Sequence, residues 1–406
     1  MKALLPKIKF KNFDEKWNRK KLHSIAPLRG GFAFKSEKFQ NTGIPIVRIS
    51  NIKFDGTIGG EFEYYSKIIS DEKFVLRGRS ILLAMSGATT GKIAMLDSEE
   101  EYYQNQRVGY FQNTGEVDYD FLSSVLQTKA FTNQLNAVLV AGAQPNISSK
   151  EIDSFEFYIP DSIEEQSAIG YLLCTLDDLL SSYKDNLTNY QALKATMLSK
   201  MFPKDDQSVP EIRLDGFEDR WEERCIGELA DIVRGASPRP IQDPKWFDSN
   251  SEIGWLRISD VTNQNGRIHS LEQKISKLGQ EKTRVLTEPH LLLSIAATVG
   301  KPVVNYVKTG VHDGFLIFMN PKFDREFMFQ WLEMFREKWN RYGQPGSQVN
   351  LNSDIVKNQK ILIPSMEEQR AIGTYFLNLD NLISSNQEKI SQLEILKKKL
   401  LQDMFI

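Results

Sequence analysis

The sequence has little of several residue patterns that commonly identify a function. It has two cysteines, Cys174 and Cys225, which are too few for a disulfide framework and do not have the paired spacing of a zinc site. No stretch approaches the roughly 18 consecutive apolar residues of a membrane span. The four histidines have no metal-ligand spacing. We therefore expect a protein of the reducing cytoplasm, with no metal of its own and no membrane segment.

An excess of charge of one sign is also missing. The formal net charge is −2, which argues against a protein that binds nucleic acid by charge alone. Residues 1–160 carry 21 Lys and Arg against 18 Asp and Glu, whereas residues 161–206 carry 4 against 8. We expect any nucleic-acid surface to be a local patch, with partner proteins supplying much of the phosphate contact.

Catalytic motifs are incomplete. The segment Gly87–Lys92 looks like a phosphate-binding loop, but Ser86 and Ile93 stand where that loop needs glycine and Ser or Thr. The pair His312-Asp313 has no nearby nucleophile, and the Asn/Asp-Pro-Pro-Tyr/Phe motif typical of adenine methyltransferases does not occur. The sequence therefore predicts a non-catalytic chain.

The clearest positive feature is an internal duplication with an offset near 204. The matched segments, first copy before second, are Pro6–Trp17 and Pro210–Trp221, Arg48–Ser50 and Arg257–Ser259, Thr89–Lys92 and Thr298–Lys301, Ile159-Pro160 and Ile363-Pro364, Glu164–Gly170 and Glu367–Gly373, and Met201-Phe202 and Met404-Phe405. A period of this length is too long for a solenoid repeat. It predicts two related domains.

Each copy ends in a long amphipathic helix of about 40 residues, or about 60 Å. We expect the apolar seam to consist of Ile169, Leu172, Leu176, Leu179, Tyr183 and Leu193 in the first copy, and of Ile372, Leu379, Leu382, Leu393, Leu396 and Leu400 in the second. Asn186, Asn386 and Lys389 interrupt it and are suited to fixing register. The helices either lie separately on their domains or pair; their equal lengths favour an antiparallel coiled coil.

The segments between the helices predict mixed α/β domains. Short β-type runs occur at 44–49, 80–85, 108–111, 254–258, 291–296 and 315–319, and helices are expected at 119–136 and 325–341. The polar segment 201–210 reads as a linker. The predicted organisation is a domain at 1–160, a helix at 161–203, a second domain at 204–363 and a C-terminal helix at 364–406.

These repeated features resemble the specificity subunits of type I restriction–modification enzymes. The resemblance covers essentially the whole chain, and the doubled Glu-Glu-Gln-x-Ala-Ile-Gly helix followed by Leu-Asp is its most specific part. It implies two pseudo-symmetric target-recognition domains, each reading half of a bipartite, asymmetric site in double-stranded DNA, held by an antiparallel coiled coil. It further implies docking of two modification (methyltransferase) subunits and, through them, restriction/translocase subunits. S-adenosylmethionine, ATP and Mg are expected in those partners and not in this chain.

Candidate DNA contacts are polar residues on predicted loops. Arginine and lysine suit guanine and phosphate, asparagine and glutamine suit adenine, and glycine allows close approach. The candidates are Arg29, Gly30, Lys35, Lys92, Gln104, Asn105, Arg107, Gln144, Arg234, Arg239, Lys245, Lys301, Gln344, Ser347 and Gln348. Arg48 and Arg257 match between the copies, which favours a framework role. For each candidate, a structural role in a turn or a position on the solvated surface is the simpler interpretation.

Two other functions stay open at this stage. The chain could be a duplicated coiled-coil scaffold that binds only proteins, which sequence-selective retention on DNA would exclude. It could also be an enzyme of unknown type, although the missing catalytic constellation speaks against that.

Overall fold

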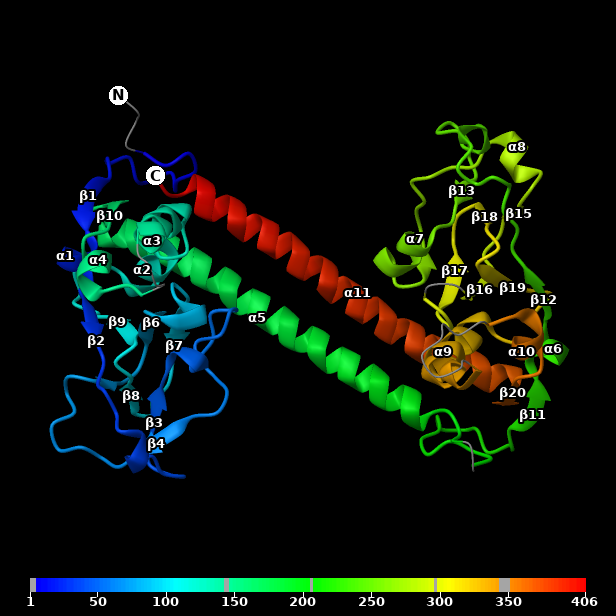
Figure 1. The fold of residues 1–406 in the computed structure, drawn as a ribbon, viewed down its shortest axis with the longest axis horizontal. Coiled ribbons are helices and arrows are strands. Elements are labelled where there is room, and N and C mark those ends of the chain that lie inside the picture. Colours follow the sequence, from blue (N-terminus) through cyan, green and yellow to red (C-terminus); the bar gives the residue numbers. More distant parts are fainter. Residues whose placement is uncertain (1–4, 142–145, 205–206, 296–297, 343–350) are drawn as a thin grey trace. The chain divides into compact units, whose positions relative to one another are not determined.

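In the computed structural model, the described residues are 5–141, 146–204, 207–295, 298–342 and 351–406. The chain divides into two compact units, Met1–Lys184 with Glu388–Ile406, and Asp185–Gln387. Each unit contains one globular domain and a part of both long helices (Figure 1).

The first unit is built from short strands and helices. Its strands are β1 (Asn18–Lys21), β2 (Leu28–Gly30), β3 (Ile44–Val47), β4 (Glu63–Tyr65), β5 (Val75–Leu76), β6 (Ser80–Ala84), β7 (Ile93–Leu96), β8 (Tyr102–Gln104), β9 (Val108–Phe111) and β10 (Glu156–Ile159). Its α-helices are α1 (Leu22–Ile25), α2 (Tyr119–Val125), α3 (Lys129–Ala141), α4 (Ser149–Asp153) and the start of α5 (Ile163–Lys200). The sheets have the orders β2-β9-β6-β7, β4-β3-β8-β5 and β1-β10.

The second unit has a related arrangement, with sheets of five and three strands where the first unit has two sheets of four. Its strands are β11 (Glu222–Cys225), β12 (Asp231–Arg234), β13 (Gly254–Trp255), β14 (Arg267–Ile268), β15 (Arg284–Leu286), β16 (Leu291–Ser294), β17 (Pro302–Asn305), β18 (Thr309–Val311), β19 (Phe315–Met319) and β20 (Lys360–Ile363). Its α-helices are α6 (Ile226–Leu229), α7 (Ile258–Asn263), α8 (Lys277–Gln280), α9 (Arg325–Phe335), α10 (Ser353–Lys357) and the start of α11 (Met366–Asp403). The sheets are β12-β19-β16-β17-β14, β13-β18-β15 and β11-β20.

All six predicted strands are present, most of them shorter than their apolar runs. The predicted helix at 119–136 is divided into α2 and α3, because the Thr128 hydroxyl accepts the main-chain N–H of Phe131 at 3.3 Å and starts a new helix. The helix predicted at 325–341 ends at Phe335 and continues as a 3-10 helix, Arg336–Tyr342.

The repeated tryptophans and phenylalanines join each domain to the end of a long helix. In the first unit the Trp17 and Phe405 rings lie 6.1 Å apart, and in the second the Trp221 and Phe202 rings lie 6.4 Å apart. Met201 and Phe202 are each 2 % exposed, so the interpretation of 201–210 as a linker is wrong at its start. These residues belong to the core because burial of large apolar side chains stabilises the helix end against the domain.

The repeated Glu-Glu-Gln-x-Ala-Ile-Gly segment has one structural role in both units. The Gln166 side-chain carbonyl accepts the main-chain N–H of Asp118 at 2.8 Å, and its amide donates to the Pro160 carbonyl at 2.8 Å. Asp118 in turn caps α2 by accepting from Phe121. A Cβ added to Gly170 would lie 2.4 Å from the Phe121 nitrogen. The glycine is therefore needed so that α2 can begin directly against α5.

The second unit repeats these contacts at matching residues. Gln369 accepts from the Asp324 N–H at 2.9 Å and donates to the Pro364 carbonyl at 2.8 Å. A Cβ on Gly373 would lie 2.6 Å from an Asp324 carboxylate oxygen. The motif therefore fixes each domain on its long helix.

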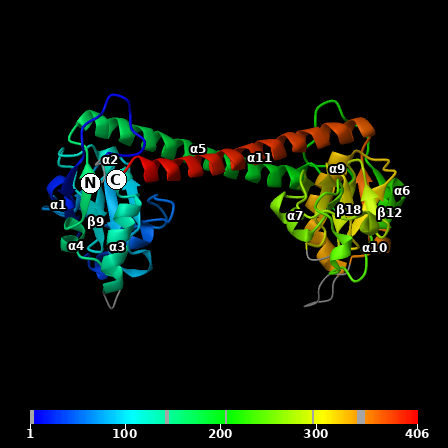
Figure 2. The ribbon, with the colours of Figure 1, turned by 90° about the horizontal axis from the view of Figure 1, so that it is seen from above.

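The two long helices pair in an antiparallel coiled coil (Figure 2). In the first unit Lys184 pairs with Glu394 at 2.9 Å, and Asp177 pairs with Lys397 further toward the start of α5. In the second unit Lys194 Nζ lies 2.5 Å from Asp380 Oδ1. In the first unit the residue number on α11 rises as that on α5 falls, which gives the antiparallel direction.

The buried stripe of each helix coincides with the predicted seam at Ile169, Leu176, Ile372 and Leu379, and elsewhere it is shifted by one position. The most buried residues are Ile169, Leu173, Leu176 and Leu180 in α5, and Ile372, Phe376, Leu379 and Ile383 in α11. Of the predicted seam, Leu172, Tyr183, Leu393 and Leu400 are half-buried, whereas Leu179, Leu193, Leu382 and Leu396 remain 37–43 % exposed. The stripe is rotated because the helices bury side chains against the domain cores as well as against each other.

Candidate functional site

Both domains contain a place where two chain segments cross in close contact. In the first unit the Phe32 N–H donates to the Gln104 carbonyl at 2.9 Å. A Cβ on Gly31 would lie 2.2 Å from the carbonyl oxygen of Asn105, so this position requires glycine. The segment after β2 therefore runs directly over residues Asn105–Arg107, which we call the first crossing turn.

The second unit has the matching crossing. The Ala236 N–H donates to the Val311 carbonyl at 3.0 Å, and a Cβ on Gly235 would lie 2.1 Å from the carbonyl oxygen of His312. Residues His312–Gly314 are accordingly the second crossing turn. The two turns occupy equivalent places but carry different side chains.

The two crossings show which of the candidate residues are equivalent in the two units. With the two crossing glycines superposed in register, Arg234 matches Gly30 and Arg29 matches Val233, so Arg29 and Arg234 are not equivalent. Successive strand residues point to opposite faces, and the two arginines have different surroundings for that reason. No Cβ contact restricts Gly30, which is exposed.

Arg29 is half-buried inside the first domain. Its guanidinium donates to Gln104 Oε1 at 3.2 Å and to the Val75 carbonyl at 2.8 Å, and it lies 4.6 Å from the centre of the Tyr110 ring. Burial lowers the pKa of Arg29. In this conformation the side chain holds β2, β5 and β8 together.

Gln104 is fully buried. Its amide donates to the main-chain oxygens of Arg29 and Val108 at 2.8 and 2.7 Å. All of its polar atoms are thus used inside the domain, and it could reach DNA only by leaving this position.

The other first-unit candidates lie nearer the surface. Asn105 accepts the Arg107 N–H at 3.2 Å and shapes the turn. The exposed side chains of Arg107 and Lys35 make no hydrogen bond or ion pair with another described residue. They are therefore available to a ligand.

The second crossing turn holds a fixed carboxylate. Asp313 Oδ1 accepts from the Ser237 hydroxyl at 2.7 Å, and Oδ2 accepts from Arg239 Nη2 at 2.6 Å. Arg234 Nε donates to the Asp313 carbonyl at 2.6 Å. Burial alone would raise the pKa of Asp313, but Ser237 and Arg239 outweigh it and hold that pKa below its usual range. Arg234 and Arg239 therefore meet at one turn.

His312 attaches the second crossing turn to aromatic side chains of its domain. Its ring lies 5.8 Å from that of Trp255 and 4.8 Å from that of Phe315, and its Nδ1 accepts the Gly314 N–H at 2.9 Å. Burial lowers the pKa of His312, which favours the neutral imidazole at neutral pH.

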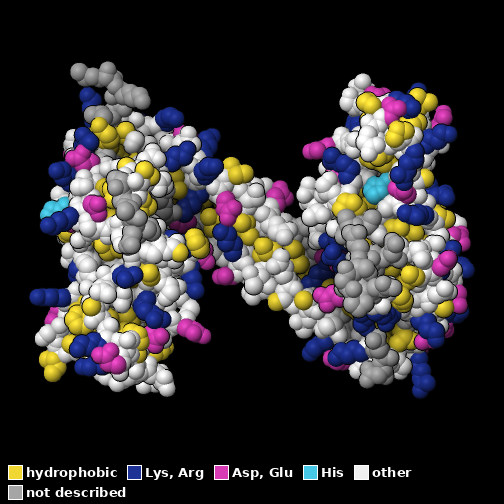
Figure 3. Space-filling model, in the orientation of Figure 1, with side chains coloured by type: hydrophobic (Ala, Val, Ile, Leu, Met, Phe, Trp, Pro, Cys, Tyr) yellow, Lys and Arg dark blue, Asp and Glu magenta, His cyan; other side chains and the backbone are white. Residues whose placement is uncertain are grey.

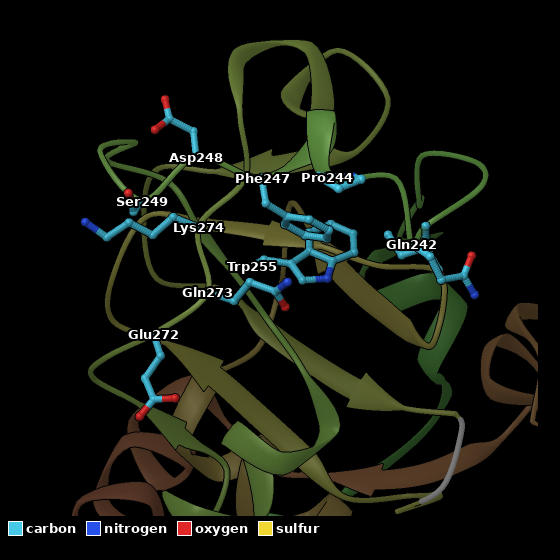
Figure 4. A pocket seen from close by; sticks show the side chains of 10 residues that line it. Gln242, Pro244, Phe247, Asp248, Ser249, Trp255, Glu272, Gln273 and Lys274 are labelled. Atoms are coloured by element: carbon cyan, nitrogen blue, oxygen red, sulfur yellow. The ribbon is translucent and has the colours of Figure 1, made fainter.

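A hollow of about 710 Å³ lies beside the loop that follows Arg239 (Figure 4). Its lining consists of Ile241, Gln242, Pro244, Phe247, Asp248, Ser249, Trp255, Glu272, Gln273 and Lys274. Figure 4 shows the Phe247 and Trp255 rings together at its centre, 6.4 Å apart. The candidate Lys245 is not part of the lining; it pairs with Asp243 at 2.8 Å and lies over the Trp246 ring.

Lys92 and Lys301 match in sequence but differ in environment. Lys92 lies over the ring of Phe54, which is 89 % exposed. Lys301 is largely buried, donates to Asn265 Oδ1 at 2.6 Å, and has its pKa lowered by burial. Lys92 is placed to meet a ligand, whereas Lys301 supports the second domain.

Arg48 and Arg257 each begin a short helix. The main-chain N–H of Arg48 donates to Asn51 Oδ1 at 3.0 Å, and that of Arg257 donates to Asp260 Oδ2 at 2.9 Å. Arg257 also forms an ion pair with Asp260 at 2.9 Å. These contacts cap the two short helices. Local capping therefore explains why the Arg-Ile-Ser segment occurs in both copies.

The remaining candidates Gln144, Gln344, Ser347 and Gln348 lie outside the described residues. Within the described part of the chain, no three His, Cys, Asp or Glu side chains are grouped so that they could hold a metal ion. The helices described here include none long and apolar enough to cross a membrane. On the face shown in Figure 3, Lys and Arg are interspersed with Asp and Glu.

Sequence reasoning did not find the Asp313 cluster. His312-Asp313 was weighed only as a catalytic pair, and the crossing turns share no residue that a repeat search could match. The signal that could have found it is the pairing of Gly31 with Gly235 at an offset of 204. The residues after each glycine can then be compared position by position.

Comparison with known proteins gives matches across both copies. The family model described as "Type I restriction modification DNA specificity domain" matches residues 14–189 and again 218–395. The MjaVIII type I restriction enzyme specificity subunit of Methanocaldococcus jannaschii is 22% identical over 355 residues, covering 82% of this chain and 80% of that protein. The EcoBI specificity subunit of Escherichia coli is 22% identical over 425 residues, covering 97% and 86%.

A solved structure has the same fold. The type I restriction-modification S subunit from M. genitalium superposes with a TM-score of 0.68 at 16% sequence identity, covering 99% of each chain. At this identity the likeness is one of fold.

Proposed function

The chain belongs to the type I restriction modification DNA specificity domain family, and we propose that it selects the bipartite DNA target of a type I restriction–modification complex. Sequence recognition of DNA is the role that the family supports. The finer assignment is that each unit reads one half of an asymmetric target.

One observation carries this assignment. The two domains share their fold and their attachment to the long helices, but the equivalent crossing turns are Asn105–Arg107 in one and His312–Gly314 in the other. A common scaffold with different donors and acceptors at the same place is suited to reading two different sequences.

The paired helices are proposed to dock two modification subunits, which carry S-adenosylmethionine and transfer the methyl group, and through them ATP- and Mg-dependent restriction subunits. Apolar side chains that stay exposed after the helices pair support this. Tyr171 and Ile395 are 73 % and 67 % exposed, in the part of the helix pair that belongs to the first unit. Partner contacts to phosphate also fit the near-neutral charge of this chain.

The test is a long-read methylome of a methylation-free host that expresses this chain with a cognate modification subunit. We expect methyladenine in one split, asymmetric motif, and its absence when this chain is omitted. A stable complex that produces no motif would contradict the proposal and favour a protein-binding scaffold.

Replacement of residues 208–363 by the corresponding domain of a relative tests modular reading. One half of the motif should change and the other should stay. A change in both halves would contradict the assignment of one half-site to each unit.

A further inference from the structure

We propose that Arg239, oriented by Asp313, reads a guanine in the half-site contacted by the second unit. This inference rests on the proposed function. The Arg239 side chain is 74 % exposed, and one of its terminal nitrogens, Nη2, donates to Asp313 Oδ2 at 2.6 Å. The guanidinium therefore projects from the surface with one edge already held.

The carboxylate that holds it is fixed on several sides. Ser237 donates to Asp313 Oδ1 at 2.7 Å and accepts the Asp313 N–H at 3.2 Å. Arg234 Nε donates to the Asp313 carbonyl at 2.6 Å, and the neighbouring His312 is packed against Trp255 and Phe315. These contacts restrain Asp313, and its hydrogen bond to Nη2 favours one orientation of the Arg239 guanidinium.

A guanidinium paired with a carboxylate suits the uncharged edge of guanine better than phosphate, because the carboxylate and phosphate repel each other. Guanine presents O6 and N7 side by side in the major groove, and the planar fork of arginine donates to both at once. Among the described residues, Asp313 is the one partner of the Arg239 side chain, which leaves its other N–H donors for a base. Phosphate contact alone would not require a carboxylate beside the arginine.

The first unit differs at the same two places. Four residues beyond its crossing glycine is Lys35 in place of Arg239, and Gln106 stands in the crossing turn in place of Asp313. Lys35 is exposed and has neither a planar fork nor a carboxylate to orient it. We therefore expect the guanine contact in one half-site and not at the equivalent place in the other.

The experiment is selection from a random DNA library by the chain assembled with its modification subunits. Arg239→Ala should cost about 10- to 100-fold in preference for guanine at one position of one half-site, with the other positions kept. Arg239→Lys, which retains the charge, should lose most of the same preference. Arg224→Ala is the matched control, because Arg224 is an exposed arginine paired with Glu222 at 2.9 Å on β11; it should leave the motif unchanged.

Asp313→Asn tests the positioning role through a base analogue. Wild-type protein should bind a target with 7-deazaguanine at that position several-fold more weakly, because N7 is gone. Asp313→Asn and Arg239→Ala should both discriminate less between guanine and 7-deazaguanine. A purely structural role of Asp313 would weaken both targets equally and overturn its assignment.

The outcomes separate the two proposals. If wild-type protein selects a motif and neither Arg239 variant relaxes a guanine, the guanine assignment is wrong and the proposed function stands. Uniform weakening over all sequences would make Arg239 a phosphate contact and also overturn it. If wild-type protein selects no sequence, both proposals fail. Should Arg239→Ala unfold, Arg239→Lys decides the question.

Discussion

At the scale of single residues, the aspartates of the repeated Leu-Asp pair have different surroundings in the two copies and should contribute differently to stability. Asp380 is buried and accepts from Lys194 at 2.5 Å, Arg267 at 2.9 Å and Gln330 at 2.8 Å. Its counterpart Asp177 pairs with Lys397, but its side chain is 39 % exposed. A buried carboxylate with several charged partners cannot be removed without leaving those partners unpaired.

Asp380→Asn should therefore destabilise the second unit by about 3 kcal/mol. Urea unfolding is followed by far-UV circular dichroism, which reports on both units, and by tryptophan fluorescence, which reports mainly on the second because five of the six tryptophans lie there. The matched control is Asp177→Asn, which should cost less than about 1 kcal/mol because the Asp177 carboxylate is 39 % exposed and solvent screens its charge. Equal losses in the two variants would contradict the importance of burial here.

The same residue predicts a dependence on pH. Burial alone would raise the pKa of Asp380, but Lys194 and Arg267 outweigh it and hold that pKa below its ordinary range. A lowered folded-state pKa contributes stability above the unfolded pKa of about 4, and this contribution is lost as the pH falls through the folded value. The difference in unfolding midpoint between wild-type protein and Asp380→Asn should thus be smaller at pH 3 than at pH 7. An unchanged difference would mean that folding does not lower the pKa of Asp380.

At the scale of elements, the attachment of each domain to its helix depends on a glycine. A Cβ at Gly170 or Gly373 would come within 2.4 or 2.6 Å of the capped start of α2 or α9. Alanine raises helix propensity by about 1 kcal/mol, but forcing so short a contact apart costs about 2–3 kcal/mol, the upper part of the range for overpacking.

We expect Gly170→Ala and Gly373→Ala each to lower stability by about 1–2 kcal/mol net, measured by urea unfolding. Ser167→Ala and Thr374→Ala change exposed residues of the same helices and should stay within about 0.5 kcal/mol of wild type. A neutral effect of both glycine substitutions would show that the helix–domain contact can relax.

These elements also show what the sequence could and could not predict. The duplication was visible because both copies use Gln166 and Gln369, and Gly170 and Gly373, for the same contacts. In α5 the seam lies one position from its prediction at two places, because Leu172-Leu173 and Leu179-Leu180 are adjacent leucines. Heptad spacing alone cannot decide which of them faces a core that is formed by distant residues.

Candidate contacts were harder still to predict than the fold. Gln104 and Arg29 have the residue types of base readers, yet they bond to each other inside the domain. Asp313 has an unsuitable charge for DNA, and the role proposed for it depends on its hydrogen bond with Arg239. Residue type gives the chemistry that is available, whereas burial and partners decide whether a ligand can use it.

At the scale of the whole molecule, the proposed function makes the helix pair responsible for the distance between half-sites. Seven residues of helix correspond to about 10 Å, and this is about three base pairs of DNA. Seven residues also make nearly two full turns, so removing them keeps each helix face in place to within about 20°. The change therefore alters length while largely preserving side-chain register.

Deletion of 185–191 from α5 together with 384–390 from α11 removes opposed segments near the junction of the two units. In the methylome assay, the half-site sequences should stay the same and the spacer between them should shorten by about three base pairs. Insertion of seven residues at the same places should lengthen it by a similar amount. If both variants methylate the original motif with its original spacer, the helices hold the domains but do not measure the target.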